Sequence, residues 1–217
     1  MKPVVLQASG LKKYYKSGDN TTRALDGVNL EVRYGKFVAV VGTSGCGKTT
    51  LLSLLGGLDS ATKGKILFDG KDIMEKGLAN HRRNHVSFIF QAYNLIDYMT
   101  PLENVKLTGK LSHEPILEKM GLTKEEMKRN VLQLSGGQQQ RVAIARALAS
   151  EAPVILADEP TGNLDEDTAM SIMQILEDSV YQMNKCAIIV THSQEIAKRA
   201  DVIFHLKRGT FQKIENN

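Results

Sequence analysis

Three short runs of consecutive apolar residues, at 37–41, 154–157 and 186–190, most constrain how this chain can fold. None of the three alternates apolar with polar side chains, so each predicts a strand that is buried on both faces. Such strands are typical of parallel sheets covered by helices. Because strand-like and helix-like stretches alternate along the chain, we expect an α/β fold with a mostly parallel sheet.

Composition excludes several classes of protein. The 217 residues are 42% hydrophobic and 24% charged, which is typical of a globular chain and not of a collagen-like or disordered one. Two cysteines, Cys46 and Cys186, form no disulfide framework and favour a reducing compartment. A net charge of +4 does not by itself indicate a nucleic-acid or acidic partner. The first ten residues carry no signal-peptide pattern, and no apolar run approaches the roughly 20 residues of a membrane span.

The expected elements divide the chain into a single domain, 1–217, with an insertion. Strands are predicted at 4–8, 28–32, 37–41, 65–68 and 86–90, with turns at Tyr34-Gly35 and Asp69-Gly70. Residues 100–131 are charged and show helical periodicity, with Pro101 at a helix start. We therefore expect a helical subdomain at about 92–134, followed by helices at 139–149 and 165–182.

A glycine-rich loop directly follows the apolar run 37–41 and fits the pattern Gly-x4-Gly-Lys-Ser/Thr. Its residues are Gly42, Thr43, Ser44, Gly45, Cys46, Gly47, Lys48 and Thr49, and Thr50 continues into a helical run. Backbone N–H groups of such a loop, and of the helix after it, point at phosphate oxygens. Lys48 is expected to reach the β and γ phosphates, and the Thr49 hydroxyl to ligate Mg²⁺. The Gly-x-Gly-x-x-Gly triplet of dinucleotide-binding folds does not occur.

Two carboxylates, Asp158 and Glu159, follow the apolar run 154–157. Ligands bind at the carboxyl ends of strands in open α/β sheets, so both side chains are expected at the nucleotide. Asp158 is placed to hold Mg²⁺ together with Thr49. Glu159 is placed to polarise a water for attack on the γ phosphate.

A second possible anion site lies at residues 134–138. Ser135 is a good N-cap for the helix expected at 139–149, and Gly136 and Gly137 leave its N-terminus open to close approach. The chain thus holds two phosphate-binding helix starts. The sequence does not require both to serve one nucleotide within one chain.

Taken together and in order, six segments resemble the motifs of ABC ATPases. The segments 42–49, 134–138 and 158–160 are similar to the Walker A, signature and Walker B motifs, and Gln91, Asp165 and His192 to the Q-loop, D-loop and switch residues. Residues 134–146 and 157–165 resemble the macrolide-exporter, lipoprotein-release and FtsE group (MacB, LolD, FtsE). Residues 88–95 also resemble Bce-type antimicrobial-peptide resistance ATPases. The region from 104 to 134 is shorter than is usual in the group.

The resemblance implies an ABC-type nucleotide-binding domain, with an antiparallel N-terminal β subdomain, that hydrolyses ATP with Mg²⁺. It implies a homodimer with two ATP molecules sandwiched head to tail. Ser135, Gly136, Gly137 and Gln138 of one chain would then contact the nucleotide held by the other. Gln91 would join Thr49 and Asp158 at the metal, His192 would contact the γ phosphate, and Asp165 would join the two sites. Tyr15 would stack on adenine, with Tyr14 as the alternative.

The resemblance also implies a stand-alone cytoplasmic subunit, held at the inner face of the cell membrane by a permease of the MacB/FtsX or Bce type. Gln91 and residues 92–100 would abut that partner. Two alternatives stay open: an FtsE-like regulator of cell-wall hydrolases without transport, and a DNA-associated ABC ATPase, although the long coiled-coil insertions of the latter are missing. The basic clusters at Lys12-Lys13 and 81–85 are interpreted as solvated faces, so no nucleic-acid partner is expected.

Overall fold

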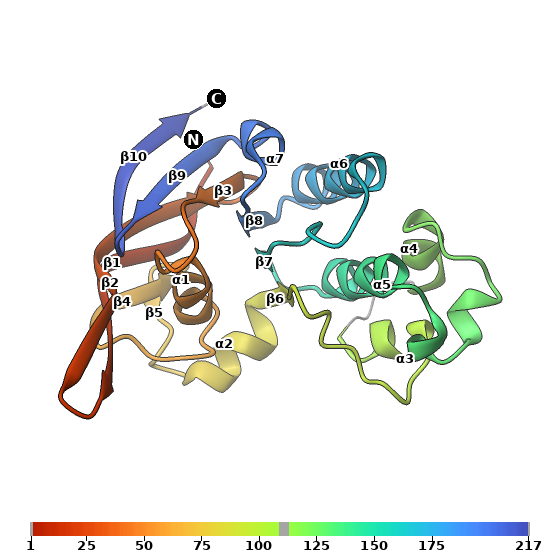
Figure 1. Ribbon diagram of the computed structural model, residues 1–217, viewed down its shortest axis with the longest axis horizontal. Helices are drawn as coiled ribbons and strands as arrows, with labels where there is room; N and C mark the ends of the chain where they lie inside the picture. Colours follow the sequence, from red (N-terminus) through yellow and green to blue (C-terminus); the bar gives the residue numbers. More distant parts are fainter. Residues whose placement is uncertain (1, 109–112, 217) are drawn as a thin grey trace.

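Two β-sheets organise the computed structural model, which describes residues 2–108 and 113–216 (Figure 1). The larger sheet has the strand order β10-β9-β3-β8-β7-β6, and all its neighbouring pairs are parallel except β9 with β10. Its strands are β3 (Phe37–Val41), β6 (Val86–Ile89), β7 (Val154–Asp158), β8 (Cys186–Val190), β9 (Val202–Lys207) and β10 (Thr210–Asn216). The smaller sheet is antiparallel, in the order β2-β1-β4-β5. Its strands are β1 (Val4–Ser17), β2 (Asn20–Arg33), β4 (Lys63–Phe68) and β5 (Lys71–Asp72).

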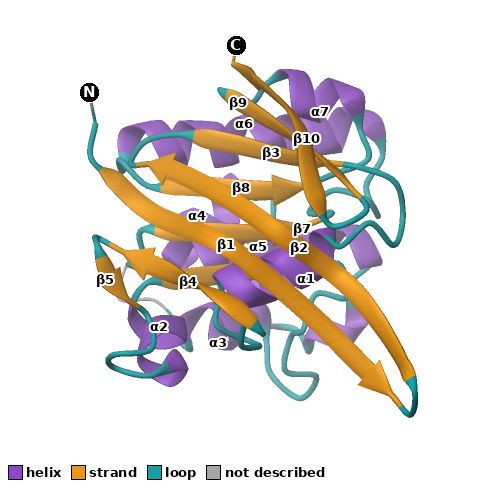
Figure 2. Ribbon diagram, turned by 90° about the vertical axis from the view of Figure 1, so that its left-hand side faces the viewer, coloured by secondary structure: helices purple, strands orange, loops and turns teal. Residues whose placement is uncertain are grey.

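The larger sheet is the middle layer, because successive side chains of its strands enter two different cores. Val38 and Val40 of β3 belong to the core shared with the smaller sheet and with helix α1 (Lys48–Leu55). Phe37 and Ala39 belong to the opposite core, shared with α5 (Gly136–Ala149) and α6 (Glu166–Gln182). Figure 2 shows the long strands β1 and β2 crossing in front of β3 and β8. This arrangement confirms the predicted α/β fold, with its mostly parallel sheet and antiparallel N-terminal β part.

A second group of helices lies beside α5, on the side away from β3 (Figure 1). It contains α3 (Pro101–Lys106), α4 (His113–Lys119) and two 3₁₀ turns, Glu126–Lys128 and Val131–Gln133. The Thr100 side chain caps α3 by accepting from the Glu103 N–H at 3.2 Å, and Pro101 occupies the first turn as predicted. Buried side chains of this group share one core with α5. The 92–134 limits of the subdomain stay a prediction.

Several predicted bounds were wrong. The strands expected at 4–8 and 28–32 are parts of two strands of 14 residues each. The helix expected from 139 begins at Gly136, directly after its Ser135 cap. The strand expected at 86–90 ends at Ile89, whereas that at 154–157 continues to Asp158. Four elements were missed: α2 (Leu78–Asn84), α7 (Gln194–Lys198), β9 and β10. Both helices are too short to show a clear apolar period.

One expected solvated face is partly buried. His81 is 0% exposed, and its Nε2 lies 2.9 Å from the Leu55 carbonyl oxygen at the end of α1. Its Nδ1 lies 3.0 Å from Nδ1 of His85, and burial lowers the pKa of His81. Lys13 also turns inward and pairs with Asp59 at 2.7 Å. A neutral histidine can be buried in a core. The prediction that residues 81–85 form a solvated basic face treated histidine like arginine and therefore overstated the exposure of this segment.

Candidate functional site

The loop from residue 42 to 49 joins β3 to α1 and depends on its glycines. Gly47 is the N-cap residue of α1 with a φ of 109°, and no side chain caps this helix. The first N–H groups of α1 are therefore open to a ligand. A Cβ on Gly47 would lie 2.4 Å from the Ala24 carbonyl oxygen, and one on Gly42 would lie 2.3 Å from that of Leu206. Strands β2 and β9 thus press on the loop so closely that only glycine fits.

Lys48 places its charge inside this loop. The residue is 7% exposed, and its Nζ donates to the carbonyl oxygens of Gly42 at 2.8 Å and Thr43 at 3.1 Å. Both acceptors are uncharged dipoles, so a phosphate oxygen is a stronger partner for the ammonium group. The lysine is consequently close to the position where a bound anion would need it.

Thr49 and Asp158 meet although 109 residues separate them along the chain. The Thr49 hydroxyl donates to Oδ2 of Asp158 at 2.9 Å. The contact forms because β7 ends beside the start of α1, with only β8 between β7 and β3 in the sheet. A hydroxyl and a carboxylate are oxygen donors of the kind that Mg²⁺ prefers, with water and phosphate completing its octahedral shell. These residues therefore fit a magnesium ion.

Glu159 occupies the next position, with a strained backbone. Its φ is 47°, a left-handed value that is uncommon for residues other than glycine, and its N–H donates to the Val190 carbonyl oxygen at 3.0 Å. Oε2 accepts from the His192 N–H at 3.3 Å. Oε1 lies 3.4 Å from Nε2 of His192 and, although buried, accepts no hydrogen bond. Burial raises the pKa of this carboxyl group.

These side chains surround one cleft of about 310 Å³. The cleft is lined by Thr22, Arg23, Ala24, Ser44, Gly45, Gly47, Lys48, Thr49, Thr50, Gln91, Asp158, Glu159 and His192. The three residues of β2 were missed by sequence reasoning. The turn signal at Gly18-Asp19 could have revealed the β1–β2 hairpin that carries them to the loop.

Tyr15 lies next to this cleft without lining it. It is 44% exposed and lies opposite Thr22 across the β1–β2 ladder. Its ring centroid is 5.0 Å from Nζ of Lys13, and its hydroxyl donates to Asp59 at 3.3 Å. The Tyr14 hydroxyl instead donates to Asp26. Because successive side chains of a strand point to opposite faces, only one of the two tyrosines can serve the nucleotide, and the choice of Tyr15 stays a prediction.

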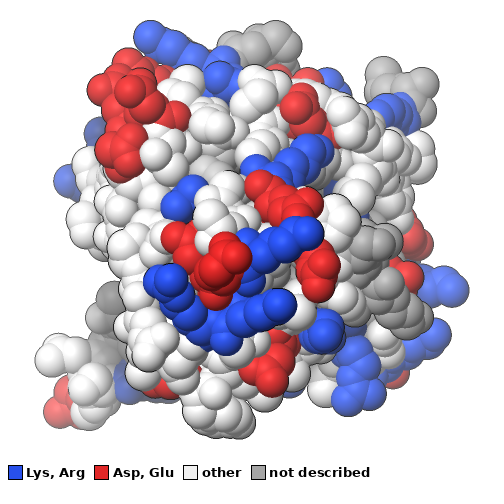
Figure 3. Space-filling view, turned by 90° about the vertical axis from the view of Figure 1, so that its right-hand side faces the viewer, with Lys and Arg blue, Asp and Glu red and all other residues white. Residues whose placement is uncertain are grey.

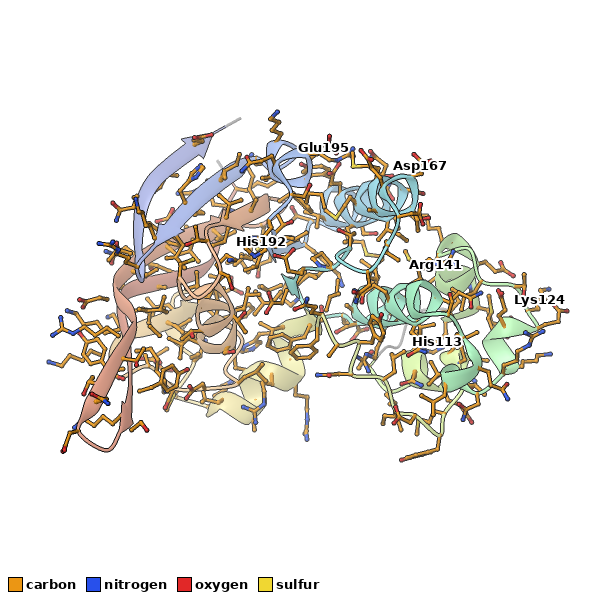
Figure 4. The ribbon with its side chains drawn as sticks, viewed as in Figure 1. His113, Lys124, Arg141, Asp167, His192 and Glu195 are labelled. Carbon is orange, nitrogen blue, oxygen red and sulfur yellow. The ribbon has the colours of Figure 1, made fainter. Side chains whose placement is uncertain are left out.

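The second predicted anion site lies outside the cleft. Ser135 and Gln138 cap α5 reciprocally: Ser135 Oγ accepts from the Gln138 N–H at 3.2 Å, and Gln138 Oε1 accepts from the Ser135 N–H at 2.9 Å. Figure 4 shows His192 next to the larger sheet, whereas Arg141, in the first half of α5, lies in the helical part. Asp165 caps α6 by accepting from the Thr168 N–H at 2.9 Å. One chain therefore keeps Ser135, Gly136 and Gly137 away from its own cleft.

A strand, a glycine-rich loop and an uncapped helix, with a hydroxyl beside a strand-end carboxylate, together define a P-loop nucleotide-binding protein. A family model described as ABC transporter matches residues 25–162. The chain belongs to this ABC transporter family.

Relatives of known sequence agree with this assignment. The chain is 47% identical over 199 residues to the uncharacterized ABC transporter ATP-binding protein YclH of Bacillus subtilis, covering 87% of this chain and 88% of the relative. It is 37% identical to the lipoprotein-releasing system ATP-binding protein LolD of Acinetobacter baylyi, covering 96% of this chain and 97% of that protein. It is 42% identical to the macrolide export ATP-binding/permease protein MacB of Hyphomonas neptunium, covering 96% of this chain but 34% of that protein. The predicted similarity to MacB and LolD is confirmed, whereas the likeness to Bce-type ATPases stays a prediction.

Solved structures agree as well. The chain superimposes on a dimeric structure of MJ0796, an ABC transporter cassette of Methanocaldococcus jannaschii, with a TM-score of 0.90 and 38% identity, covering 97% of this chain and 98% of the other. A second structure of that cassette, dimeric and bound to ADP and phosphate after hydrolysis, gives a TM-score of 0.89 at the same identity and coverage. The predicted ABC-type ATPase fold and activity are confirmed.

Proposed function

We propose that this transporter ATPase subunit hydrolyses ATP in a head-to-tail homodimer and thereby drives a membrane permease. The observation that carries the proposal is the division of the site within one chain. Lys48, Thr49, Asp158, Glu159 and His192 line a single cleft, whereas the glycines at the start of α5 lie outside it. A second copy, turned head to tail, would supply them. The dimeric structures of MJ0796 support this arrangement.

Within one chain, the cleft residues divide the chemistry. The N–H groups of the loop and the Lys48 ammonium bind the β and γ phosphates. Thr49, Asp158 and Gln91 would hold Mg²⁺, which offsets phosphate charge when it is bound. Oε1 of Glu159 accepts a proton from the attacking water while the bond from the γ phosphorus to the ADP oxygen breaks. His192 orients Glu159 through its backbone N–H and approaches the γ phosphate with its ring.

The permease partner is supported by a groove at the junction of the helical part and the larger sheet. The groove has a volume of about 400 Å³, and its lining includes Arg82, Phe88, Phe90, Leu107 and Arg146. The rings of Phe88 and Phe90 stack at 5.1 Å, and Leu107 is 52% exposed. None of the described helices is long and apolar enough to cross a membrane. We therefore propose that a permease segment with apolar and acidic side chains occupies this groove and holds the chain at the inner membrane face.

Nucleic acid is a poorer fit as a partner on the face that Figure 3 shows, where Lys and Arg side chains alternate with Asp and Glu. Binding to a nucleic-acid backbone favours a continuous basic stripe. The mixed charges of this face favour a protein partner over a DNA-associated role.

The dimer is tested by the dependence of activity on protein concentration. Because each cleft needs the partner's α5, specific ATPase activity is expected to rise with concentration until the dimer saturates. Ser135→Arg is expected to retain ATP binding and to lose turnover, since the added side chain blocks the approach to a second chain. Steady-state hydrolysis over a dilution series, with fluorescent-nucleotide titration, measures both. Full specific activity at dilutions where sedimentation shows only monomer would contradict the proposal.

The acid side of the pH profile is a further prediction. Burial raises the pKa of Glu159 above the ordinary 4.5, and the His192 N–H only partly opposes this effect. A general base must be ionised, so falling pH is expected to abolish kcat at a higher pH than for a solvated glutamate. The measurement is kcat at saturating MgATP, with circular dichroism to show that the fold persists. An acid limb at or below 4.5 would show that Glu159 is not the group that titrates.

A further inference from the structure

Two consecutive residues after Gln91 have left-handed backbones without being glycine. Tyr93 has a φ of 60° and Asn94 a φ of 49°. Bulky residues rarely adopt this region, and such residues persist only where surrounding contacts hold them. The segment 91–94 therefore needs a partner that fixes its shape.

That partner is Arg146, near the end of α5. Its guanidinium donates to the carbonyl oxygens of Asn94 at 2.6 Å and Tyr93 at 2.9 Å. The ion pairs found in the described part of the chain do not include Arg146, so its partly buried charge is met by these carbonyl dipoles. Burial lowers the pKa of Arg146, in keeping with a desolvated guanidinium. One side chain thus holds both left-handed residues.

The hydrogen bonds from Arg146 to the Tyr93 and Asn94 carbonyl oxygens form a clamp at the C-terminal end of α5. From this clamp the Tyr93 side chain extends toward the N-terminal end of α5. A Cβ added to Gly136 would lie 3.0 Å from the Tyr93 hydroxyl oxygen, so the ring ends against the first residue of α5. Gly136 and Arg146 are about 15 Å apart along the helix axis. Leu164 contacts the neighbouring glycine similarly, with its Cδ2 3.2 Å from a Cβ built on Gly137. Tyr93 and Leu164 therefore flank the two glycines that the proposed function presents to the other protomer.

We propose that Arg146 is a positioning residue that locks the turn at Tyr93 and Asn94 against α5, so that Tyr93 sets the position of Gly136 for the nucleotide of the other protomer. This inference rests on the proposed function and adds to it two residues that do not line the nucleotide cleft. Arg146 also lines the groove proposed for the permease. The same clamp would therefore transmit a shift in the groove to the surface that closes on the partner.

The test uses Glu159→Gln as the parent, since this variant should accumulate the ATP-bound dimer. Arg146→Lys keeps one positive charge but loses the planar fork that reaches two carbonyl oxygens. Tyr93→Ala removes the ring and leaves Arg146 intact. Arg141→Lys is the matched control, because Arg141 lies on the same helix and donates to the Met120 carbonyl oxygen at 3.0 Å (Figure 4). All variants are made in the full chain.

We expect Arg146→Lys and Tyr93→Ala to weaken the ATP-induced dimer at least tenfold by analytical ultracentrifugation. Trinitrophenyl-ATP affinity of the monomer should stay within twofold of the parent, because neither Arg146 nor Tyr93 lines the cleft. The Arg141→Lys control should dimerise like the parent.

Two results overturn the inference while leaving the proposed function standing. One is parent-like dimerisation of both variants. The other is a parallel loss of monomer nucleotide affinity and thermal stability, which would assign Arg146 a structural role. A parent that stays monomeric with ATP would instead overturn the proposed function, and this inference with it.

Discussion

A Glu159→Gln variant is expected to bind ATP normally yet turn it over about 10²–10⁴ times more slowly, the range that a general base contributes. Oε1 of Glu159 is buried, accepts no hydrogen bond and lies 3.4 Å from Nε2 of His192. Because no donor occupies it, this oxygen can accept a proton from the attacking water. Glutamine preserves the volume of the side chain but cannot take that proton. The ATP-bound dimer should accumulate, which gel filtration with MgATP detects.

The matched control for this experiment is Glu195→Gln. Glu195 lies in the first turn of α7, three residues after His192, and is exposed (Figure 4). The same change of charge at this position should leave kcat within about twofold of the wild-type value, since surface substitutions have small effects. Wild-type turnover in Glu159→Gln would show that Glu159 is not the general base. His192 would then be the next candidate for that role.

Replacing Lys48 should act on nucleotide binding itself. Lys48→Met keeps the aliphatic stem that is buried in the loop and removes only the ammonium group. A hydrogen bond to a charged group contributes about 1.5–3 kcal/mol, so ATP affinity should fall roughly 10- to 100-fold. Isothermal titration calorimetry with MgATP, in the Glu159→Gln background to prevent hydrolysis, measures the change directly.

Two comparisons separate this effect from a loss of folding. Lys48 donates to the Gly42 and Thr43 carbonyl oxygens, so its loss should also lower the free energy of unfolding by about 0.5–1.5 kcal/mol per bond. Denaturant unfolding without nucleotide measures this loss in the free energy of unfolding. Lys71→Ala, on the exposed strand β5, removes the same charge away from the cleft and should leave ATP affinity unchanged. Unaltered ATP affinity in Lys48→Met would rule out phosphate binding by Lys48 and its glycine-rich loop.

Local features of the fold were predictable because neighbouring residues determine them. Asp69 and Gly70 form the turn between β4 and β5 with φ values of 46° and 75°, as the dipeptide indicated. Ser135 caps the helix that follows it, as expected from its residue type. The strand at Cys186–Val190 has the predicted bounds, since five apolar residues between polar ones leave little choice.

Features that depend on distant contacts were not predictable in this way. Nothing local distinguishes His81, which is buried against Leu55, from the exposed Arg83 two residues later. The left-handed turn at Tyr93 and Asn94 depends on Arg146, more than 50 residues away. The approach of Ala24 to Gly47 follows from the length of the β1–β2 hairpin, whose register irregularities no apolar pattern encodes.

The sequence by itself determined the glycine-rich loop, the carboxylates at a strand end and the capped helix start, because backbone geometry and hydrogen bonds within a few residues decide each of them. Only the tertiary structure decided which of these meet: Thr49 with Asp158 in one cleft, and Ser135 outside it. The physical reason lies in the larger sheet. Its central strands are apolar on both faces, so their composition permits many strand orders. The order β3-β8-β7 is selected by packing of the whole chain, and it brings β7 to the start of α1.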